Sequence, residues 1–548
     1  METKHPPEGG PLLQIKGLKI DGFAEDEWKP IIKGIDLELN RGEVLGLIGE
    51  SGAGKSTLGL AAMGFVRDGC RFSAGSVTFD NIDLINASRD VRRTLRSTRI
   101  AYVAQSAAAS FNPAKKLIDQ YCEFPVLRGV MNRMDAESDA IAIFDRLKLP
   151  EPETIGFRYP HQVSGGQLQR AMTAMAGACR PDLIIFDEPT TALDVTTQIE
   201  VLSAIRDTVR EIGTAAIYIT HDLAVVAQMA DRIKVLRYGE AVETADTRSM
   251  LASPQEDYTK SLWAVRNLKT ETKPQVEETA EPQLSIRSVT AAYGKTPVLH
   301  DVSFDIHRGR TVAVVGESGS GKSTVARVIC GLLPAGKGEI SLDSKVLPLT
   351  TRTRSKSQLQ KIQMIYQMAD TALNPKQRVG EIIGRPVQFY LGLTGKQRTE
   401  RVRELLQEID MDPDVYMHRF PGELSGGQKQ RIGIARALAA EPDLIICDEV
   451  TSALDQVVAE GILKLLARLQ RDRQLTYMFI THDLATVRVI ADDVVVMQYG
   501  KVVEAGTKNE ILSPPYAPYT ELLISSVPEM DPDWLTRVLD TRRLTEAK

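Results

Sequence analysis

The chain has 548 residues, 43% of them hydrophobic and 25% charged, which is an ordinary composition for a globular protein. Its 67 Lys and Arg against 72 Asp and Glu give a net charge of −5, which excludes a global basic field for nucleic acid. The sequence holds no apolar run near the ~20 residues that a bilayer span needs, and its start has no signal-peptide core. We therefore expect a protein that is neither secreted nor anchored in a membrane by its own chain.

The first strong element is an apolar run at Val44–Ile48, which predicts a buried strand and leads into G-E-S-G-A-G-K-S-T at 49–57. Glycines at this spacing let backbone N–H groups curl around an anion, and the following helix points its N-terminus at the phosphates. The lysine then reaches the β- and γ-phosphates, and the serine beside it is a Mg²⁺ ligand. The pattern predicts a nucleotide site with candidate residues Gly49, Ser51, Gly52, Gly54, Lys55, Ser56 and Thr57.

Further along, S-G-G-Q at 164–167 precedes a helical pattern. Alone it could be an ordinary Ser N-cap with a glycine turn. An apolar strand run then ends in Asp187 and Glu188. A carboxylate at this end of a strand can hold Mg²⁺ through water, a role we give to Asp187. Glu188 is then the candidate to orient or deprotonate the attacking water.

The same motifs return in the same order in the second half of the chain, which indicates a tandem duplication. G-E-S-G-S-G-K-S-T spans 316–324, after the strand run Val312–Val315. Two phosphate loops, each between a strand run and a helical pattern, exclude chance and predict two nucleotide sites. The second set of candidates is Gly316, Ser318, Gly319, Gly321, Lys322, Ser323, Thr324, Ser425, Gly426, Gly427, Gln428, Asp448 and Glu449.

Short apolar runs that alternate with helical patterns predict a largely parallel sheet covered on both faces in each half. The further strand runs are Leu183–Phe186, Ala216–Ile219, Leu444–Cys447 and Met478–Ile480. Near the end of each half, hairpins are expected to turn at Gly239 and Gly500. We place an N-terminal tail at 1–10, the halves at 11–268 and 283–530, a Glu- and Pro-rich linker at 269–282, and a charged tail at 531–548.

With these motifs the sequence resembles the ATP-binding-cassette (ABC) ATPases over essentially its whole length. S-G-G-Q stands where the family has its signature, here Ser164, Gly165, Gly166 and Gln167 in the first half. The aspartates of the Ala-Leu-Asp D-loops, the Q-loop glutamines and the switch histidines match as Asp194, Asp455, Gln105, Gln367, His221 and His482. The resemblance implies an α/β fold of two tandem P-loop NTPase (RecA-like) cassettes, each with an antiparallel β subdomain and a helical subdomain.

The resemblance also implies how the halves cooperate. Two cassettes of one chain pair head to tail, so that each ATP lies between one P-loop and the opposite signature. Lys55 would share a nucleotide with Ser425, and Lys322 with Ser164. The Q-loop glutamines would join the serines and aspartates around Mg²⁺, and the switch histidines would bond the γ-phosphate. Because both halves keep every motif, we expect two competent sites.

Adenine stacking is a separate expectation. Tyr293 is well placed in the second half. For the first half, Phe23 and Trp28 are candidates, and the alternative that such an aromatic fills the apolar core stays open.

Two further features resemble the dipeptide/oligopeptide/nickel importer ATPases: S-F-N-P and A-L-N-P after the Q-loops, and the end segments S-P-Q-E-D-Y-T and S-P-P-Y-A-P-Y-T. The fused form is similar to single-chain ATPases of bacterial peptide and glutathione importers. That resemblance implies a peripheral subunit on the cytoplasmic face of the inner (plasma) membrane, with two transmembrane permease subunits and a periplasmic or extracellular solute-binding protein. The helical segments 106–163 and 368–424 would receive the permeases.

Several relatives carry a cysteine cluster after the end segment, but this chain has no cysteine beyond Cys447, so we expect no iron–sulfur cluster. Ala517 also replaces a histidine of the subfamily pattern. The cargo is not fixed by an ATPase subunit, and peptide, glutathione, nickel and opine stay open. A ribosome-associated tandem ABC protein is the alternative, but its long basic linker contrasts with the short, acidic one here, so no nucleic-acid partner is expected.

Overall fold

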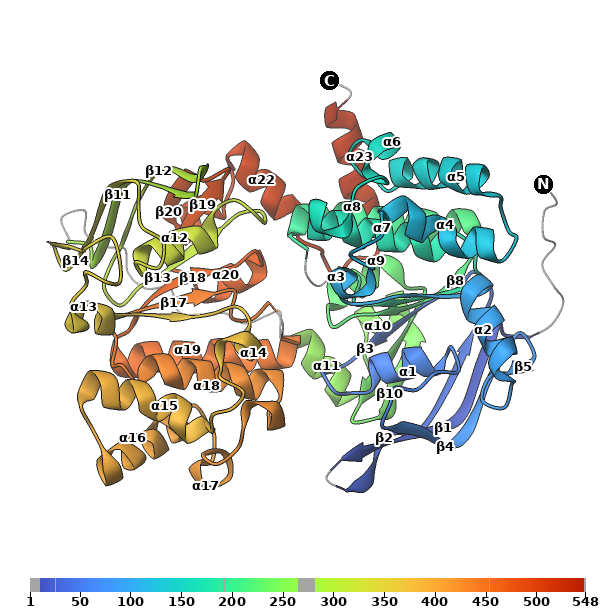
Figure 1. Cartoon of the computed structure of the whole chain (residues 1–548), viewed down its shortest axis with the longest axis horizontal. Helices are drawn as coiled ribbons and strands as arrows, with labels where there is room; N and C mark the ends of the chain where they lie inside the picture. Colours follow the sequence, from blue (N-terminus) through green and yellow to red (C-terminus); the bar gives the residue numbers. More distant parts are fainter. Residues whose placement is uncertain (1–9, 25, 191–192, 265–280, 453, 547–548) are drawn as a thin grey trace. The chain divides into compact units, whose positions relative to one another are not determined.

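The computed structural model describes residues 10–24, 26–190, 193–264, 281–452 and 454–546 (Figure 1). The chain forms two compact units, called unit 1 (Met1–Ala264 with Pro528–Lys548) and unit 2 (Val265–Val527). The expected N-terminal tail lies outside the described residues except for Gly10, and the expected linker lies outside them except for its last two residues. The expected C-terminal tail contains a helix that belongs to unit 1.

Each unit is built on a six-stranded sheet that is parallel except for one edge strand. In unit 1 the order is β10-β9-β3-β8-β7-β6, with β3 (Val44–Ile48), β6 (Ile100–Val103), β7 (Leu183–Asp187), β8 (Ala215–Ile219), β9 (Arg232–Arg237) and β10 (Glu240–Asp246). In unit 2 it is β16-β17-β18-β13-β19-β20, with β13 (Thr311–Val315), β16 (Ile362–Ile365), β17 (Leu444–Asp448), β18 (Thr476–Ile480), β19 (Asp493–Gln498) and β20 (Lys501–Thr507). Every predicted strand run lies in one of these strands, and the hairpin turns fall at Gly239 and Gly500 as predicted.

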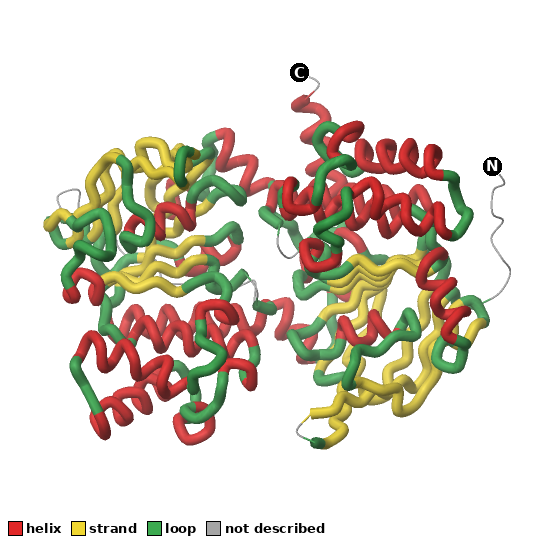
Figure 2. Tube along the Cα trace, viewed as in Figure 1, coloured by secondary structure: helices red, strands yellow, loops and turns green. Residues whose placement is uncertain are grey.

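Alternate side chains of a central strand enter different cores, as the period of two in a strand requires. In β7, Ile184 and Phe186 pack with α7 (Gly165–Gly177) and α8 (Val195–Ile212). Leu183 and Ile185 pack on the other face with α1 (Lys55–Ala61) and an antiparallel sheet. Unit 2 repeats the arrangement with α18 (Gly426–Leu438), α19 (Gln456–Arg473) and α12 (Lys322–Ile329). Figure 2 shows the strands of each unit between these layers, which explains why they read as continuous apolar runs.

A four-stranded antiparallel sheet accompanies each parallel sheet, as expected. Its strands are β1 (Leu13–Ala24), β2 (Glu27–Leu39), β4 (Cys70–Phe79) and β5 (Ile82–Asp83) in unit 1, and β11 (Leu284–Tyr293), β12 (Thr296–Ile306), β14 (Lys337–Leu342) and β15 (Lys345–Val346) in unit 2.

The segments 106–163 and 368–424 are helical, as expected. They hold α3 (Ala107–Ser110), α4 (Leu117–Leu127), α5 (Arg133–Arg146) and α6 (Pro152–Ile155), and α14 (Ala369–Ala372), α15 (Val379–Pro386), α16 (Gly395–Glu408) and α17 (Pro413–Tyr416). The other helices are α2 (Arg89–Thr98), α9 (Leu223–Met229), α10 (Thr247–Ala252), α11 (Asp257–Ala264), α13 (Lys356–Lys361), α20 (Leu484–Ile490), α21 (Lys508–Ile511), α22 (Pro518–Ser525) and α23 (Trp534–Glu546). No helix in the described ranges is both long and apolar enough to cross a bilayer.

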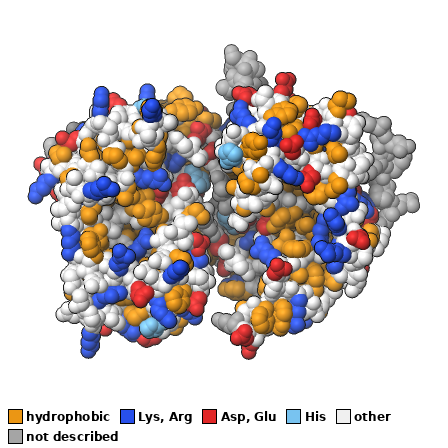
Figure 3. All heavy atoms as spheres, in the orientation of Figure 1, with side chains coloured by type: hydrophobic (Ala, Val, Ile, Leu, Met, Phe, Trp, Pro, Cys, Tyr) orange, Lys and Arg blue, Asp and Glu red, His pale blue; other side chains and the backbone are white. Residues whose placement is uncertain are grey.

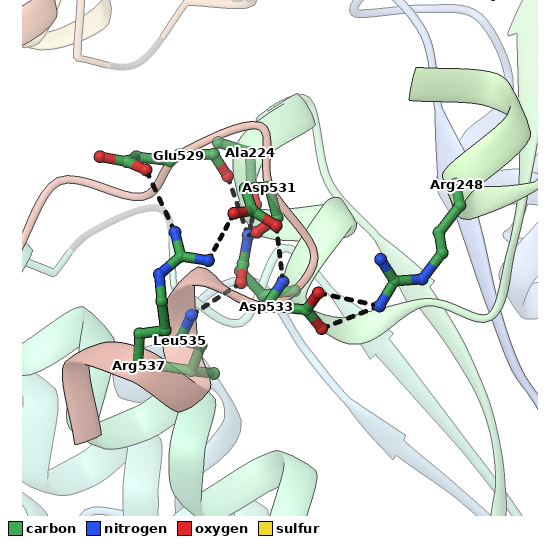
Figure 4. Close-up of polar contacts among 8 residues, drawn as sticks. Ala224, Arg248, Glu529, Asp531, Asp533, Leu535 and Arg537 are labelled. Carbon is green, nitrogen blue, oxygen red and sulfur yellow. Dashed lines mark hydrogen bonds and ion pairs between the residues drawn. The ribbon is translucent and has the colours of Figure 1, made fainter. Parts of the chain in front are cut away.

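Residues 528–546, called the C-terminal strap, follow unit 2 in sequence but pack within unit 1. Trp534 and Leu535 at the start of α23 are buried in the same core as α7 and α8. The amide of Gln228 on α9 donates to the carbonyls of Glu529 and Asp531, both at 2.8 Å, and accepts from the Leu535 N–H at 3.0 Å. Figure 4 shows Glu529, Asp531 and Leu535 of the strap together with the ion pair of Asp533 with Arg248.

Candidate functional site

The predicted phosphate loop of each unit connects a central strand to a helix N-terminus. Gly49 has φ 147°, and a Cβ there would lie 2.2 Å from the carbonyl oxygen of Leu236. Gly316 has φ 146°, and a Cβ there would lie 2.1 Å from the carbonyl oxygen of Met497. Both the backbone angle and the close approach therefore require glycine at the entrance of each loop.

The loop lysines fold back over their own loops. Lys55 Nζ donates to the carbonyl oxygens of Gly49 (2.7 Å) and Glu50 (2.9 Å). Lys322 Nζ makes the same two bonds to Gly316 and Glu317, both at 2.7 Å. Each ammonium group is thus held at the loop that is expected to bind phosphates, although its side chain is almost entirely buried. A buried cation that closes an anion nest is suited to a phosphate ligand.

A hydroxyl and a carboxylate meet next to each loop. Ser56 Oγ donates to Asp187 Oδ1 at 2.9 Å, and Ser323 Oγ donates to Asp448 Oδ1 at 2.8 Å. Burial raises the pKa of Asp448. Among the described residues, no group of three or more His, Cys, Asp or Glu side chains could hold a metal. The serine–aspartate pair instead offers a few hard oxygen ligands, which is the kind of set that Mg²⁺ accepts when phosphates and water complete its shell.

The two aspartates differ in one contact. The hydroxyl of Tyr102 on β6 donates to Asp187 Oδ2 at 2.5 Å. Tyr102 pairs with Ile185 in the sheet register, and Met364 takes the equivalent place beside Ile446 in unit 2. Sequence reasoning missed Tyr102, because its neighbour along the sheet is visible only once the strand order is known.

The predicted catalytic glutamates are each held from two sides. The Gln105 amide nitrogen donates to Glu188 Oε2 at 3.0 Å, and His221 Nδ1 lies 3.2 Å from Glu188 Oε1. In unit 2, Gln367 lies 2.5 Å and His482 3.4 Å from the carboxylate of Glu449. The structure therefore brings the Q-loop glutamine, the glutamate and the switch histidine together within each unit.

The backbone and the charges of this cluster are also unusual. Glu188 and Glu449 have φ of 50° and 49°, a left-handed conformation that is rare outside glycine and concentrates at functional sites. Burial alone would lower the pKa of His221, but the hydrogen bond and the charge of Glu188 outweigh burial and raise it. The pKa of His482 is raised in the same way by Glu449. The glutamate beside each histidine thus favours the protonated form of the imidazole.

The signature serines cap the helices that they precede. The Gln167 N–H donates to Ser164 Oγ at 3.3 Å, and the Ser164 N–H donates to Gln167 Oε1 at 3.0 Å. Ser425 and Gln428 form the same capping box at the start of α18. The cap that sequence analysis considered as an alternative is therefore present, and the glutamine side chain is part of it.

The signature glycines have two different surroundings. A Cβ on Gly166 would lie 2.9 Å from Thr197 Cγ2, and one on Gly427 would lie 2.4 Å from Val458 Cγ1. A Cβ on Gly165 would have no described atom within 4 Å. Helix packing thus explains the second glycine of each signature but not Gly165, which is exposed.

The remaining predicted residues lie in the phosphate loops, in the first turns of the helices after them, or at helix N-caps. Ser51, Gly52 and Gly54, and Ser318, Gly319 and Gly321, lie in the loops, and Thr57 and Thr324 lie in the first turn of α1 and α12. Asp194 and Asp455 cap α8 and α19, while the preceding D-loop alanines, 192 and 453, lie outside the described residues.

The aromatic candidates lie at the ends of the antiparallel sheets. Tyr293 is 43% exposed, and its hydroxyl accepts a hydrogen bond from Arg327 at 2.9 Å. Phe23 and Trp28 are 52% and 41% exposed, with ring centroids 5.3 Å apart. The alternative that either of these two fills the apolar core is therefore wrong.

Sequence reasoning also missed Tyr258 and Tyr519, which contact the phosphate loops. The Glu50 N–H donates to the hydroxyl of Tyr258, and the Glu317 N–H to that of Tyr519. The repeated Tyr-Thr pair at the end of both halves was the available signal.

Comparison with known proteins agrees with this geometry. The chain matches the family described as "ABC transporter" over residues 32–191 and 299–452, and the "Oligopeptide/dipeptide transporter, C-terminal region" over 503–547. It is 35% identical to the glutathione import ATP-binding protein GsiA of Escherichia coli O6:H1 over 96% of this chain and 91% of that protein. The GsiA protein of Shigella dysenteriae is 36% identical with the same coverage.

Among solved structures, cbiO1 from Clostridium perfringens, described as part of the ABC transporter complex cbiONQ, aligns at a TM-score of 0.39 and 28% identity. The alignment covers 42% of this chain and 90% of cbiO1. The family match and the GsiA relatives favour the transporter expectation over the ribosomal alternative. The chain therefore belongs to the ABC transporter family, as an ATPase with two cassettes that carries the C-terminal region of the oligopeptide/dipeptide transporters.

Proposed function

We propose that the chain is the ATP-hydrolysing subunit of a bacterial ABC importer, which drives uptake of peptides or related small solutes through two separate permease subunits. The observation that carries the proposal is the match of residues 503–547 to the oligopeptide/dipeptide transporter C-terminal region, at the end of a chain with two equipped cassettes. The similarity to glutathione import ATP-binding proteins over 96% of the chain supports import and makes glutathione one candidate cargo.

We propose that each ATP is bound by the phosphate loop of one cassette and the signature of the other, so that Lys55 serves with Ser425 and Lys322 with Ser164. Both serines are exposed at the N-termini of 13-residue helices, where the helix dipole favours an anion. The open surroundings of Gly165 support the same idea, because a glycine without a packing role permits close approach of the backbone to a ligand.

Hydrolysis then uses the carboxylate cluster. The lysine and the loop N–H groups bind the phosphates, and the switch histidine bonds the γ-phosphate. Glu188 or Glu449, oriented by its glutamine and histidine, accepts the proton of the attacking water. Ser56 and Asp187, and Ser323 and Asp448, would hold Mg²⁺ with the Q-loop glutamines, and the ion when bound offsets the charge of the phosphates.

The partners follow from the helical segments. In unit 1, Phe124, Leu127 and Met134 on α4 and α5 are 49%, 65% and 74% exposed. Large apolar side chains this exposed suit a surface that receives another protein. Figure 3 shows basic, acidic and hydrophobic side chains interspersed on the face in view, without separation by sign. We propose permease docking at the helical segments, on the cytoplasmic face of the membrane, with a solute-binding protein joining the complex outside.

The test changes each glutamate singly and together to glutamine. Each single change is expected to lower turnover well below half, and the double change to lower it about 10²- to 10⁴-fold, because the base is lost at one or both pockets. Glu211→Gln, an exposed residue paired with Arg146, is the matched control. Near-full turnover in Glu188→Gln or Glu449→Gln would contradict two equivalent sites.

The importer assignment is tested separately in proteoliposomes that contain the chain together with candidate permease subunits. ATP-dependent accumulation of labelled peptide or glutathione is expected with the wild-type chain and not with the double variant. Co-sedimentation of the chain with ribosomes, with no association with the permeases, would overturn the proposal.

A further inference from the structure

After the hairpins β9–β10 and β19–β20, each unit has a Tyr-Thr pair at the start of a helix. The tyrosine of each pair contacts the phosphate loop of its own unit. In unit 1 the pair opens α11, and the Glu50 N–H donates to Tyr258 Oη at 3.3 Å. In unit 2 the pair opens α22, and the Glu317 N–H donates to Tyr519 Oη at 3.1 Å. The same contact is thus present in both cassettes, between segments about 200 residues apart.

The peptide group that each tyrosine contacts also binds the loop lysine. The peptide between Gly49 and Glu50 accepts Lys55 Nζ at its carbonyl oxygen (2.7 Å) and donates its N–H to Tyr258. Because both atoms belong to one planar group, fixing the N–H also fixes the direction of the carbonyl. The tyrosine therefore determines the orientation of a group that holds the lysine ammonium.

Unit 2 has the same relay. Lys322 Nζ lies 2.7 Å from the carbonyl oxygen of Gly316, and the N–H of the same peptide group donates to Tyr519. A further bond joins the other end of each loop to the hairpin turn of the same unit. The N–H of Gly239 donates to the carbonyl oxygen of Ala53 at 3.2 Å, and the N–H of Gly500 donates to that of Ser320 at 3.0 Å. The loop is thus attached at its entrance to the tyrosine and at its far end to the turn.

The tyrosines are held in place by carboxylates on the edge strands. Glu243 on β10 accepts the backbone N–H groups of Gln255 (2.9 Å) and Glu256 (3.2 Å), just before α11. On β20, Glu504 accepts the hydroxyl of Thr520, the neighbour of Tyr519. Each end segment is therefore fixed to the sheet independently of the phosphate loop.

The environment keeps the hydroxyl of Tyr258 in its neutral form. Tyr258 is 9% exposed, and burial raises its pKa. The guanidinium of Arg237 lies 4.4 Å from the centre of its ring. A neutral hydroxyl keeps a lone pair for the loop N–H without placing a negative charge beside the phosphates.

We infer that Tyr258 and Tyr519 are positioning residues for ATP binding, which act through the loop peptide on Lys55 and Lys322. The inference rests on the proposed role of these lysines at the phosphates. Through this contact the end segment of each cassette contributes to nucleotide affinity, and loss of the hydroxyl affects ground-state binding more than the chemical step.

The test uses the full chain with Tyr258→Phe, Tyr519→Phe and both changes together. Tyr238→Phe and Tyr499→Phe are the matched controls, because these tyrosines stand in the adjacent hairpin turns and are 64% and 78% exposed. Affinity for a fluorescent ATP analogue, the KM and kcat for ATP, and Tm are measured for every variant. Nucleotide binding needs no permease, so the result is independent of whether import is observed.

In the double variant we expect the dissociation constant and KM to rise about two- to tenfold, the net effect of one hydrogen bond per site. The kcat should change less than twofold and Tm by no more than about 4 °C, because each unit loses one hydrogen bond that is already present without nucleotide. Both control variants should behave as the wild type. Unchanged affinity in the double variant would overturn the inference. A parallel loss of affinity, kcat and Tm would also overturn it, since the hydroxyl would then serve the fold in general. A wild-type chain that binds no nucleotide would refute the proposed function as well.

Discussion

Replacement of Leu535 by alanine tests whether the C-terminal strap is held by apolar packing. Leu535 has no exposed surface and Trp534 is 4% exposed, and both lie in the unit 1 core. Burying alanine instead of leucine costs about 2–5 kcal/mol in well-packed cores. The ion pair of Arg248 and Asp533 contributes little, because its side chains are 67% and 58% exposed. We therefore expect Leu535→Ala to lower the free energy of strap opening by about 2–5 kcal/mol.

Hydrogen exchange read by mass spectrometry on peptides from 528–546 measures this free energy directly. Even the lower limit of about 2 kcal/mol corresponds to exchange about 30-fold faster in Leu535→Ala. Asp533→Asn, which removes the exposed ion pair, is the control and should change exchange far less. Peptides from β7 and β8 should keep their protection if the strap opens locally. Equal exchange of α23 in Leu535→Ala and wild type would refute the reasoning that this side chain holds the strap.

Two other predictions concern stability. Gly166→Ala should lower the Tm of unit 1, because overpacking against Thr197 costs about 1–3 kcal/mol. Gly165→Ala should leave Tm unchanged and lower ATP turnover. Equal effects of both variants on Tm would contradict the different surroundings of the two glycines. Asp410→Asn tests acid sensitivity. Burial alone would raise the pKa of Asp410, but the hydrogen bonds and charges of Arg431 and Arg468, both at 2.9 Å, together lower it. The stabilisation is therefore complete above the ordinary pKa of 3.8 and is lost as pH falls through the lowered value. The Tm difference between the wild type and Asp410→Asn should therefore shrink as pH falls in acid, and a difference that grows there would contradict the pairing.

The parallel sheet and the phosphate loops could be predicted because local sequence determines them. The run Val44–Ile48 is buried on both faces and is followed by glycines whose backbone angles no other residue adopts readily. The same holds for the strands that end in Asp187 and Asp448, where burial demands an apolar run and the run ends at a carboxylate. Residues that act through such local patterns can be read from spacing alone.

The contacts that sequence reasoning missed are all long-range. Tyr102 contacts Asp187 because their two strands pair in the sheet, and Tyr258 contacts Glu50, which lies about 200 residues earlier in the chain. The strap was predicted only as a charged tail, because α23 shows a mixed pattern of polar and apolar residues. Its apolar face is explained by a core whose other members, such as Val225 and Met229, lie about 300 residues earlier. Chain spacing carries no signal for contacts of this kind.

The C-terminal region of the family, residues 503–547, contains both the Tyr519 contact and the strap. Its first part bonds the phosphate loop of unit 2. Its last part packs against Gln228 on α9, a helix whose N-cap, Asp222, directly follows the switch histidine of unit 1. Only Thr520 to Val527, which include most of α22, separate Tyr519 from the start of the strap. One short stretch of chain thus connects a segment that contacts the phosphate loop of unit 2 with a segment that packs on the helix after the switch histidine of unit 1. A variant with a flexible insertion after Val527 would keep both contacts and break only their mechanical connection, so a change in the cooperativity of ATP hydrolysis would show that the connection itself matters.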